Sequence, residues 1–335
     1  MLPLPWRITF VTNPDECNLR CPMCSAHSDE ARVYRPAAST PRRLALRDVI
    51  RAIDSLSPPP REVIPSTRGE PLLWDGLPGL AEACGARGIS LNVTTNGSFP
   101  GRGAEGWARI LCPVSSDVKV SWGAASPWLD SELIGGRDPV QALDDLRTFV
   151  RVRDETAAAG GNRCGVSLQV AARTDNVAEL PALVRLAAVE GLDRVKVNHL
   201  QLHFPSLSTS SLRQRPDGVR RWNEAVGAAH DAATTTPRRG GGEVVLRGFV
   251  ELPEHGEPPS GDCPFAGREA WVEVDGTYLP CPAPAAREGQ LGNLGSLRDQ
   301  TLAAAWGAPA WRAVGDGWRD LAPCRGCAFR SPGGA

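Results

Sequence analysis

The sequence lacks the features of secreted, membrane-spanning and nucleic-acid-binding proteins. It does not begin with a basic segment followed by an apolar run, and no stretch approaches the ~20 apolar residues that span a bilayer. The formal net charge is −1 and charges of both signs are interspersed, so no basic patch is available to neutralise phosphates. We therefore expect a cytoplasmic protein with no membrane and no nucleic acid among its partners.

A disulfide framework is not expected either, although the chain has ten cysteines. Disulfides belong to exported proteins, and here seven of the ten cysteines fall into close-spaced clusters near the two ends of a chain without an export signal. This distribution favours metal ligation. The other three, Cys84, Cys112 and Cys164, stand alone in the sequence.

Over roughly its first 200 residues the chain alternates short β-branched runs with amphipathic helical stretches, which is the pattern of a parallel sheet built from βα units. Strands are predicted at 7–12, 62–66, 89–95, 117–121, 165–170 and 194–200. With a crossover after each strand, they predict an α/β fold, a partial (β/α)6 TIM-like barrel.

Two apolar stripes at helical spacing are predicted to face the core. The first consists of Leu46, Val49, Ile50 and Ile53, and the second of Val140, Leu143 and Leu146. Asp138 followed by Pro139 predicts the start of the second helix, because aspartate caps helix N-termini and proline fits the first turn.

Three segments are expected along the chain. Residues 1–236 form the barrel with a following helix, 237–261 form a linker or connecting strand, and 262–335 form a small C-terminal cysteine-ligated cluster domain. Within the last segment, Asp275-Gly276 predicts a hairpin between strands at 271–274 and 277–279, because this pair is a strong turn signal.

Cys17, Cys21 and Cys24 have the spacing CxxxCxxC and come directly after the first predicted strand. Three thiolates on one tight loop can bind three irons of a cubane and leave the fourth iron without a protein ligand. The amino and carboxylate groups of an amino acid can bind that open iron. A zinc ion with some fourth ligand is the alternative for the same spacing.

This loop and the predicted barrel resemble the radical S-adenosylmethionine (SAM) superfamily. The resemblance implies a 4Fe–4S cluster and bound SAM, from which the enzyme generates a 5′-deoxyadenosyl radical that takes a hydrogen atom from the substrate. It also implies a flavodoxin- or ferredoxin-type electron donor.

The resemblance further implies SAM-binding residues at the ends of the strands. The turn at 66–71 is similar to the family's Gly-Gly-Glu-Pro turn, with Glu70 as the candidate contact for the SAM amino group and Arg68 in place of the first glycine. The other candidates share inward-facing positions by strand alternation and are Asn96, Ser121 and Gln169.

The second cysteine set, Cys263, Cys281, Cys324 and Cys327, resembles the Twitch module, a short relative of the SPASM extension. The resemblance implies that all four thiolates ligate an auxiliary 4Fe–4S cluster. The predicted hairpin would fold Cys263 and Cys281 toward each other, and the Cys-x-x-Cys turn would close the site. A structural zinc ribbon is the alternative.

The Twitch enzymes that the sequence most resembles act on sugars and aminocyclitols in antibiotic biosynthesis. The sixteen residues before Cys17 cannot form a leader-binding domain, so a small-molecule substrate is expected. We expect an oxidoreductase that oxidises a C–H/C–OH group of a sugar or aminocyclitol. The alternatives are an epimerase of such a substrate, a maturase of ribosomal peptides, and a zinc-binding protein without catalysis.

Catalytic candidates follow from these reactions. Oxidation of an alcohol requires a base, and His199 and His203 after the sixth strand are the candidates. They would share one face with Gln201 if the strand continued. An epimerase requires a hydrogen donor, usually a thiol, for which Cys164 is the candidate, although its parity with Val166 points toward the helices.

Overall fold

The computed structural model describes residues 3–34, 42–66, 68–253, 261–327 and 329–330. The chain forms two compact units, each assembled from segments that are distant in sequence. The first unit comprises Met1–Pro14, Pro41–Asn92 and Glu257–Ala335, and the second comprises Asp15–Thr40 and Val93–Gly256.

The first unit joins the beginning and the end of the chain. Its strands are β1 (Arg7–Phe10), β2 (Glu62–Pro65), β8 (Glu269–Val272), β9 (Tyr278–Leu279) and the first half of β3 (Ser90–Thr95). Its helices are α2 (Leu46–Asp54), η1 (Pro71–Leu73), α3 (Leu77–Ala86), α9 (Pro284–Arg287), α10 (Leu302–Gly307), α11 (Pro309–Gly317), η5 (Trp318–Asp320) and α12 (Ala322–Arg325). The strand order is β3-β2-β1-β8-β9; β9 is antiparallel to β8 and the other pairs are parallel.

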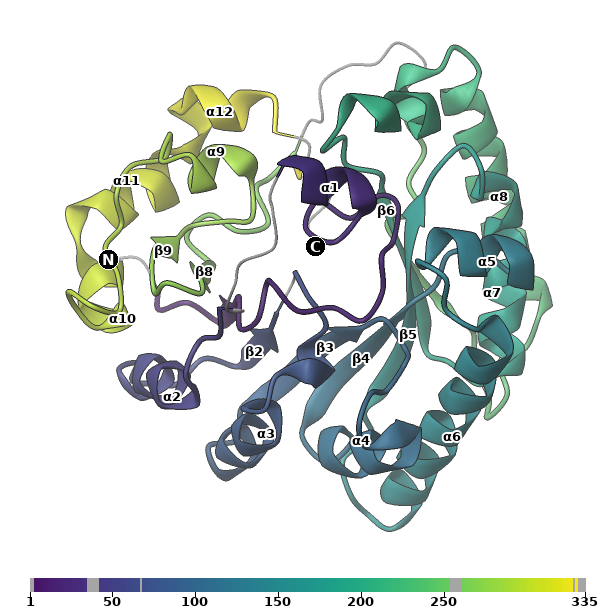
Figure 1. Ribbon diagram of the computed structural model, residues 1–335, viewed down its shortest axis with the longest axis horizontal. Coiled ribbons are helices and arrows are strands. Elements are labelled where there is room, and N and C mark those ends of the chain that lie inside the picture. The colour runs from purple at the N-terminus through teal and green to yellow at the C-terminus, as the bar shows by residue number, and fades with distance from the viewer. Residues whose placement is uncertain (1–2, 35–41, 67, 254–260, 328, 331–335) are drawn as a thin grey trace. The chain divides into compact units, whose positions relative to one another are not determined.

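The second unit contains the remaining elements, and its strands follow the order β7-β6-β5-β4-β3. The strands are the second half of β3, β4 (Ser115–Ser121), β5 (Gly165–Ala172), β6 (Arg194–His199) and β7 (Val245–Arg247), and β4 to β7 pair in parallel. The helices are α1 (Asp29–Tyr34), α4 (Gly103–Leu111), α5 (Pro127–Leu133), α6 (Pro139–Ala158), η2 (Val177–Glu179), α7 (Leu180–Val189), η3 (Pro205–Ser210), η4 (Leu212–Gln214) and α8 (Gly218–Thr235). In Figure 1, α4, α6, α7 and α8 run along the strands of this unit.

Side-chain alternation gives the strands an apolar face and a polar face. In β6, Val195 and Val197 are buried, whereas Lys196 is half-buried and Asn198 is exposed. Helix α7 contacts β6, and the apolar residues of α7 are buried. The apolar face of the strands therefore packs against helices. The polar residues therefore lie on the opposite face, which is the inner face of the predicted barrel.

Ion pairs occupy the polar face of the first unit. The Arg7 guanidinium donates to Glu62 at 2.6 Å and to Glu269 at 2.7 Å, and Asn92 Nδ2 donates to Glu62 at 3.1 Å. Burial raises the pKa of Glu269 while the charge of Arg7 opposes that shift. Arg7 thus ties β1 to both of its neighbours, β2 and β8.

All six predicted strands are present, each within two residues of its expected bounds at either end. The predicted hairpin is confirmed by the antiparallel pairing of Trp271 with Leu279 and of Val272 with Tyr278. The sequence did not predict that β8 would also pair in parallel with β1. Period-two alternation identifies a strand but does not identify its partners.

The helix α6 confirms one prediction and corrects another. The Asp138 carboxylate accepts from the backbone N–H groups of Val140 at 2.9 Å and Gln141 at 3.2 Å, as a capping residue should. Val140 itself is 65% exposed, so its expected place in the core is wrong. The buried stripe of α6 includes Ala142 and Leu146, and Val140 lies about 200° around the helix from Ala142.

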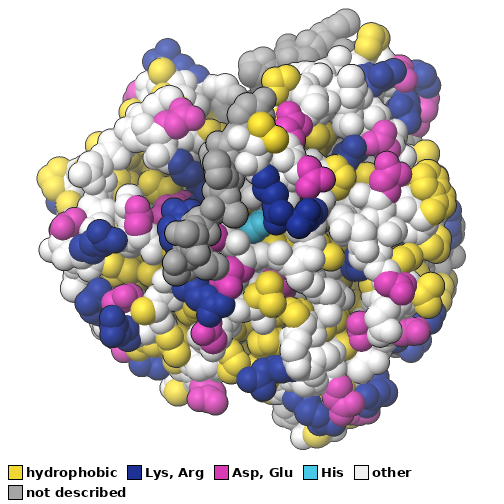
Figure 2. All heavy atoms as spheres, viewed as in Figure 1, with side chains coloured by type: hydrophobic (Ala, Val, Ile, Leu, Met, Phe, Trp, Pro, Cys, Tyr) yellow, Lys and Arg dark blue, Asp and Glu magenta, His cyan; other side chains and the backbone are white. Residues whose placement is uncertain are grey.

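On the face drawn in Figure 2, Lys and Arg side chains are interspersed with Asp and Glu side chains. Within the described ranges, the helices are all too short or too polar to cross a bilayer.

Candidate functional site

The loop that carries Cys17, Cys21 and Cys24 belongs to the second unit. The Cys24 N–H donates to the Cys21 carbonyl at 2.9 Å, and the Ser28 N–H donates to the Cys24 carbonyl at 3.3 Å. The Ser28 hydroxyl then accepts from the Ala31 N–H at 3.0 Å, at the start of α1. These bonds hold the three thiols on one short turn.

Backbone amides point at two of these sulfurs. The Leu19 N–H lies 3.5 Å from Cys17 Sγ, and the N–H groups of Ala26 and His27 lie 3.4 Å and 3.3 Å from Cys24 Sγ. Hydrogen bonds to cysteine sulfur stabilise the thiolate and set the reduction potential of a bound iron–sulfur cluster.

The acidity of the Cys21 thiol is strongly perturbed. Burial, together with the neighbouring sulfurs of Cys24 and Cys17, raises the pKa of Cys21 to about 12, while Arg137 acts in the opposite direction. The mutual effect shows that the three sulfurs are close in space. A metal that binds here must displace the Cys21 proton, so iron binding and proton release are linked.

Asn96, predicted to bind SAM, lies against the cysteine loop. Its Nδ2 donates to Asn18 Oδ1 at 2.9 Å and lies 3.8 Å from Cys17 Sγ. Its Oδ1 accepts from the Ser98 N–H at 2.9 Å and the Ser98 hydroxyl at 2.7 Å. The amide therefore connects the end of β3 to the loop.

Arg137, which was not identified from the sequence, connects the backbone at the ends of β3 and β4. It is 4% exposed, and its guanidinium donates to the Asn96 carbonyl at 2.8 Å, the Ser121 carbonyl at 2.9 Å and Asp130 at 2.7 Å. It also lies over the Trp122 ring, 4.4 Å from the centroid. This buried ion pair joins the ends of β3 and β4, and a lone arginine after two glycines gives no sequence signal for it.

Gly135 allows the chain before Arg137 to approach the cysteine loop. Its φ is +64°, and a Cβ there would lie 2.5 Å from the Cys21 backbone nitrogen and 2.6 Å from the Arg20 backbone. Cβ atoms do not approach backbone this closely, so any side chain at this position must displace the loop.

Ser121 and Gln169, two predicted SAM contacts, are brought side by side. Strand pairing aligns Ser121 with Gln169 and Gln169 with Lys196, which forms one row across β4, β5 and β6 on the polar face. Both predicted residues are half-buried. The sequence reasoning missed Lys196, although its parity with Asn198 would have placed it there.

Glu70 lies in the first unit and is 1% exposed. Its carboxylate accepts from the Leu72 N–H at 3.2 Å and caps η1, and its carbonyl accepts from Asn13 Nδ2 at 2.8 Å. Ser66, with φ at 54°, begins the turn; position 67 lies outside the described residues. The turn is thus anchored by hydrogen bonds, and the proposed contact of Glu70 with the SAM amino group stays a prediction.

Arg68, which replaces a glycine of the family's turn, forms an ion pair with Glu273 at the end of β8. Glu273 also pairs with Arg287 of α9 at 3.0 Å. Because all three residues belong to the first unit, these pairs tie the turn after β2 to the segment that carries the second cysteine set. The substitution thereby has a structural role.

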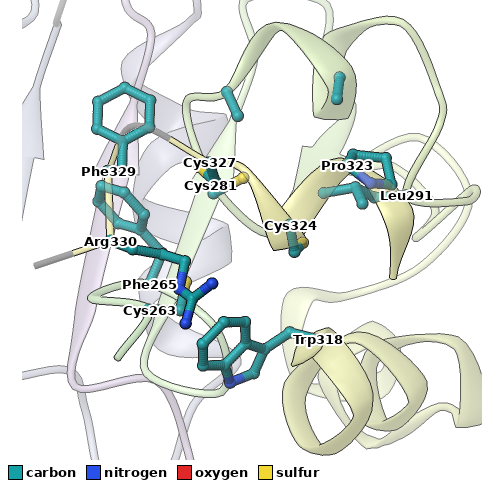
Figure 3. Close-up of a pocket in the computed structure, with 12 residues that line it drawn as sticks. Cys263, Phe265, Cys281, Leu291, Trp318, Pro323, Cys324, Cys327, Phe329 and Arg330 are labelled. Atoms are coloured by element: carbon teal, nitrogen blue, oxygen red, sulfur yellow. The ribbon is translucent and has the colours of Figure 1, made fainter. Parts of the chain in front are cut away.

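The second cysteine set surrounds one cavity of the first unit, which holds about 390 Å³ of space, part of it open to solvent. Figure 3 shows Cys263, Cys281, Cys324 and Cys327 around it, with Trp318 beside them. The remaining wall consists of Phe265, Ala283, Ala285, Leu291, Pro323, Phe329 and Arg330. The structure therefore brings together all four cysteines that the sequence assigned to one site.

The chemistry of this cavity fits an iron–sulfur cluster. Burial, together with the other sulfurs of the set, raises the pKa of Cys281 to about 12 and also raises that of Cys324. The Ala266 N–H donates to Cys263 Sγ at 3.3 Å. Four sulfur donors, apolar walls and one cation, Arg330, suit a cluster whose thiolates carry net negative charge.

Within the described part of the chain, no three His, Cys, Asp or Glu side chains converge closely enough to bind a single ion. Each thiolate of a cubane binds a different iron, so its ligands stand further apart than those of a single zinc ion. The lack of a single-ion site among the described residues is therefore compatible with a 4Fe–4S cluster at each cysteine set.

His199 does not face the interior of the barrel. Strand β6 ends at His199, so the condition under which it would share a strand face with Gln201 and His203 is not met. The His199 ring lies 4.4 Å from the Trp222 ring of α8. A side chain that points toward the helices is poorly placed to act as a base on a substrate in the barrel.

The acidity of His199 also disfavours that role. Burial lowers the pKa of His199 to about 4, and the charge of Arg213 adds to the shift. The Nδ1 atom is buried and has no hydrogen-bond partner among the described residues. His203 is exposed on the loop after β6, with its ring 6.5 Å from that of Phe204, and its role as a base stays a prediction.

Cys164 is fully buried on the helix-facing side of β5. Its thiol donates to the Gly165 carbonyl at 3.2 Å, and a hydrogen bond with Cys112 together with burial raises its pKa. Cys84 and Cys112 are buried as well. This placement does not support Cys164 as a hydrogen donor, since such a donor must reach the substrate.

Comparison with known protein families agrees with this geometry. Residues 14–120 match the radical SAM superfamily, and residues 263–328 match SPASM, an iron–sulfur cluster-binding domain. The chain therefore contains a radical SAM domain. This domain is followed by a SPASM domain.

Relatives support the same assignment. The PqqA peptide cyclase of Xanthomonas campestris pv. campestris (strain 8004) is 26% identical over 268 residues, which cover 78% of this chain and 65% of that protein. The chain thus spans just under two-thirds of the length of this curated relative.

Solved structures share the fold. Streptococcus suis SuiB bound to S-adenosylmethionine gives a TM-score of 0.66 at 17% identity, covering 92% of this chain and 67% of that one. The structure of anSMEcpe with bound AdoMet gives 0.63 at 15% identity, covering 98% and 86%. The predicted fold class, a partial barrel with a C-terminal cluster-binding domain, is confirmed.

The expected resemblance to sugar and aminocyclitol enzymes is not supported. The curated relatives are named as peptide cyclases, and they do not support the prediction of a small-molecule dehydrogenase or epimerase. That prediction relied in part on the shortness of the segment before Cys17, and the length of this segment does not determine which substrate the barrel binds.

Gly135→Ala is expected to displace the Cys17–Cys24 loop and to prevent formation of its cluster, because the new Cβ meets the Cys21 backbone. Anaerobically reconstituted protein should fall from about eight to about four irons per chain and lose its SAM-responsive paramagnetic signal. Gly136→Ala is the matched control, since φ there is also positive, +83°, but nothing lies within 4 Å of the new Cβ. Equal iron content in the two variants would contradict the role of Gly135.

Cys281→Ala is expected to remove the second cluster alone. Iron content should fall to about four per chain, while the SAM-responsive signal of the first cluster persists. Cys84→Ala, at a buried cysteine outside both sets, should keep about eight irons. An unchanged iron content in Cys281→Ala would show that the cavity binds no cluster.

His199→Phe is expected to make the protein less sensitive to acid. Because its pKa in the folded state is about 4, below the ordinary value of 6.5, His199 stabilises the fold fully above pH 6.5 and progressively less as pH falls toward 4. Between pH 7.5 and 5.5 the wild type should lose roughly 1 kcal/mol more unfolding free energy than the variant. Denaturant titrations at both pH values measure this difference, and parallel losses would contradict the burial of a neutral imidazole.

Proposed function

We propose that this protein is a radical SAM enzyme that modifies a peptide, using one 4Fe–4S cluster at Cys17, Cys21 and Cys24 with SAM, and a second cluster in the C-terminal cavity. The observation that carries the proposal is the similarity to PqqA peptide cyclase, which extends over 268 residues and so includes more than the cysteine motifs. SuiB, which has the same fold, has been solved bound to its precursor peptide SuiA.

When bound, the reduced first cluster and SAM supply the radical chemistry that removes a hydrogen atom from an unreactive C–H group. The residues of the chain hold and enclose this site. Asn96 and Arg137 fix the cysteine loop against the ends of β3 and β4. Ser121 and Gln169 line the adjoining polar face, where we expect SAM to lie.

The second cysteine set provides a ligand for every corner of a cubane. We infer that its cluster accepts an electron rather than binding the substrate, because no iron is left open when four thiolates are present. The substrate would then lose two hydrogen atoms overall, one as an atom and one as a proton with an electron. A flavodoxin- or ferredoxin-type donor is expected to reduce the first cluster.

The test is to incubate reconstituted, reduced enzyme and SAM with peptides encoded by short reading frames beside its gene. We expect 5′-deoxyadenosine above the level made with SAM alone, and a peptide product lighter by about two mass units in mass spectrometry. Cys21→Ala should give neither. Stimulation by sugars or aminocyclitols but not by any peptide would overturn the proposal.

A further inference from the structure

The wall of the cavity that the second cysteine set surrounds contains a fixed positive charge. Among the described residues that line this cavity, Arg330 is the one cation, and the wall otherwise consists of the cysteines and of apolar and aromatic side chains. The Arg330 N–H donates to the Cys327 carbonyl at 3.1 Å, so the side chain begins just after the turn that carries the last two cysteines. Because a guanidinium stays protonated throughout the physiological pH range, this charge is always present.

Three contacts hold the guanidinium of Arg330 in one place. Its Nε donates to the Gly261 carbonyl at 3.0 Å, and its Nη1 donates to the Arg325 carbonyl at 2.9 Å. The group also lies 5.5 Å from the centroid of the buried Trp318 ring, and Figure 3 shows it pointing toward this indole. A cation over an aromatic face is attracted to the ring. The charge therefore has a defined position beside the cavity.

This charge acts on at least one sulfur of the set. Burial, together with the sulfurs of Cys263 and Cys327, raises the pKa of Cys324, and the charge of Arg330 opposes that shift. The guanidinium is therefore close enough to stabilise negative charge on the Cys324 sulfur. A charge at this distance also stabilises any further negative charge that enters the cavity.

A second arginine contacts the same indole but differs in its charge balance. Arg319 lies 4.5 Å from the centroid of the Trp318 ring, its side chain is 63% exposed, and it forms an ion pair with Asp262, the residue before Cys263. Within the described part of the chain, Arg330 forms no ion pair. Of the two arginines on this ring, the one that lines the cavity is thus the one whose charge is not neutralised.

Apolar walls alone would make the cluster a poor electron acceptor. A 4Fe–4S core with four thiolates has a net charge of about −2 when oxidised and about −3 after it accepts one electron. Apolar surroundings disfavour the more highly charged form and so lower the reduction potential. A fixed cation in the wall acts in the opposite direction, since it stabilises the added negative charge.

We propose that Arg330 raises the reduction potential of the second cluster and thereby allows this cluster to accept the electron that the substrate gives up. The inference rests on the proposed function. In that step the substrate radical, formed by loss of a hydrogen atom, gives one electron to the oxidised cluster and one proton to solvent, and the cluster is reduced by one electron. Arg330 acts through the cluster, so it is a positioning residue, and its effect must appear in the potential itself.

The test is an anaerobic redox titration of the second cluster, followed by EPR. A Cys21→Ala background removes the first cluster, so that the second titrates alone at about four irons per chain. At the midpoint potential of this background, Arg330→Gln should lower the ratio of reduced to oxidised cluster at least about tenfold, which is a midpoint lower by about 59 mV for a one-electron couple. Arg330→Lys retains a positive charge and should recover most of this difference.

The matched control is Arg319→Gln combined with Asp262→Asn. It removes an ion pair of zero net charge from the same ring and should change the ratio less than about twofold.

Three results would overturn the assignment while leaving the peptide proposal intact. The first is an Arg330→Gln midpoint equal to that of the background, and the second is an equal decrease in Arg330→Lys. The third is loss of the second cluster from Arg330→Gln, because the arginine would then serve assembly of the cluster. If the background protein binds no iron, the cavity holds no cluster, and the proposed function fails together with the assignment.

Discussion

The candidate site depends on the close approach of two backbone segments, the cysteine loop and the chain at Gly135. A cubane ligated by three thiolates requires those sulfurs to stay in fixed positions while its open corner remains accessible. The loop has few apolar residues with which to hold itself in place. It is instead fixed from outside, by the amide of Asn96 on one side and by the backbone of Gly135 on another.

Arg137 explains how this approach is stabilised. A buried guanidinium requires partners for its donors, and here Nη1 donates to two carbonyls and Nη2 to the carboxylate of Asp130, while the buried Nε has no hydrogen-bond partner among the described residues. Leaving either charge of such a buried pair without its partner costs about 3–5 kcal/mol. The pair therefore acts less as a source of stability than as a rigid connection between the ends of β3 and β4, which is what a site at those ends needs.

The sequence could predict features whose signal is local. The strands followed from β-branched runs, the start of α6 from Asp138-Pro139, and both cysteine sets from their spacing. It could not predict what depends on partners in space: the pairing of β8 with β1, the position of Arg137, or the row that contains Lys196. His199 shows a signal that the sequence reasoning missed, because its parity with Val195 and Val197 already placed its side chain toward the helices, where it contacts Trp222.

The first unit combines the beginning of the chain with the C-terminal segment that carries the second cysteine set. The C-terminal segment is not simply appended to the barrel, because β8 lies beside β1 in the same sheet and Glu269 neutralises Arg7. Removing that segment would leave β1 with an open edge and Arg7 with one carboxylate fewer. The pairs of Glu273 with Arg68 and Arg287 add a second connection, from the turn that contains Glu70 to the helix that follows Cys281. Charged contacts and strand pairing therefore connect the turn after β2 with the segment that carries the second cysteine set, within the first unit.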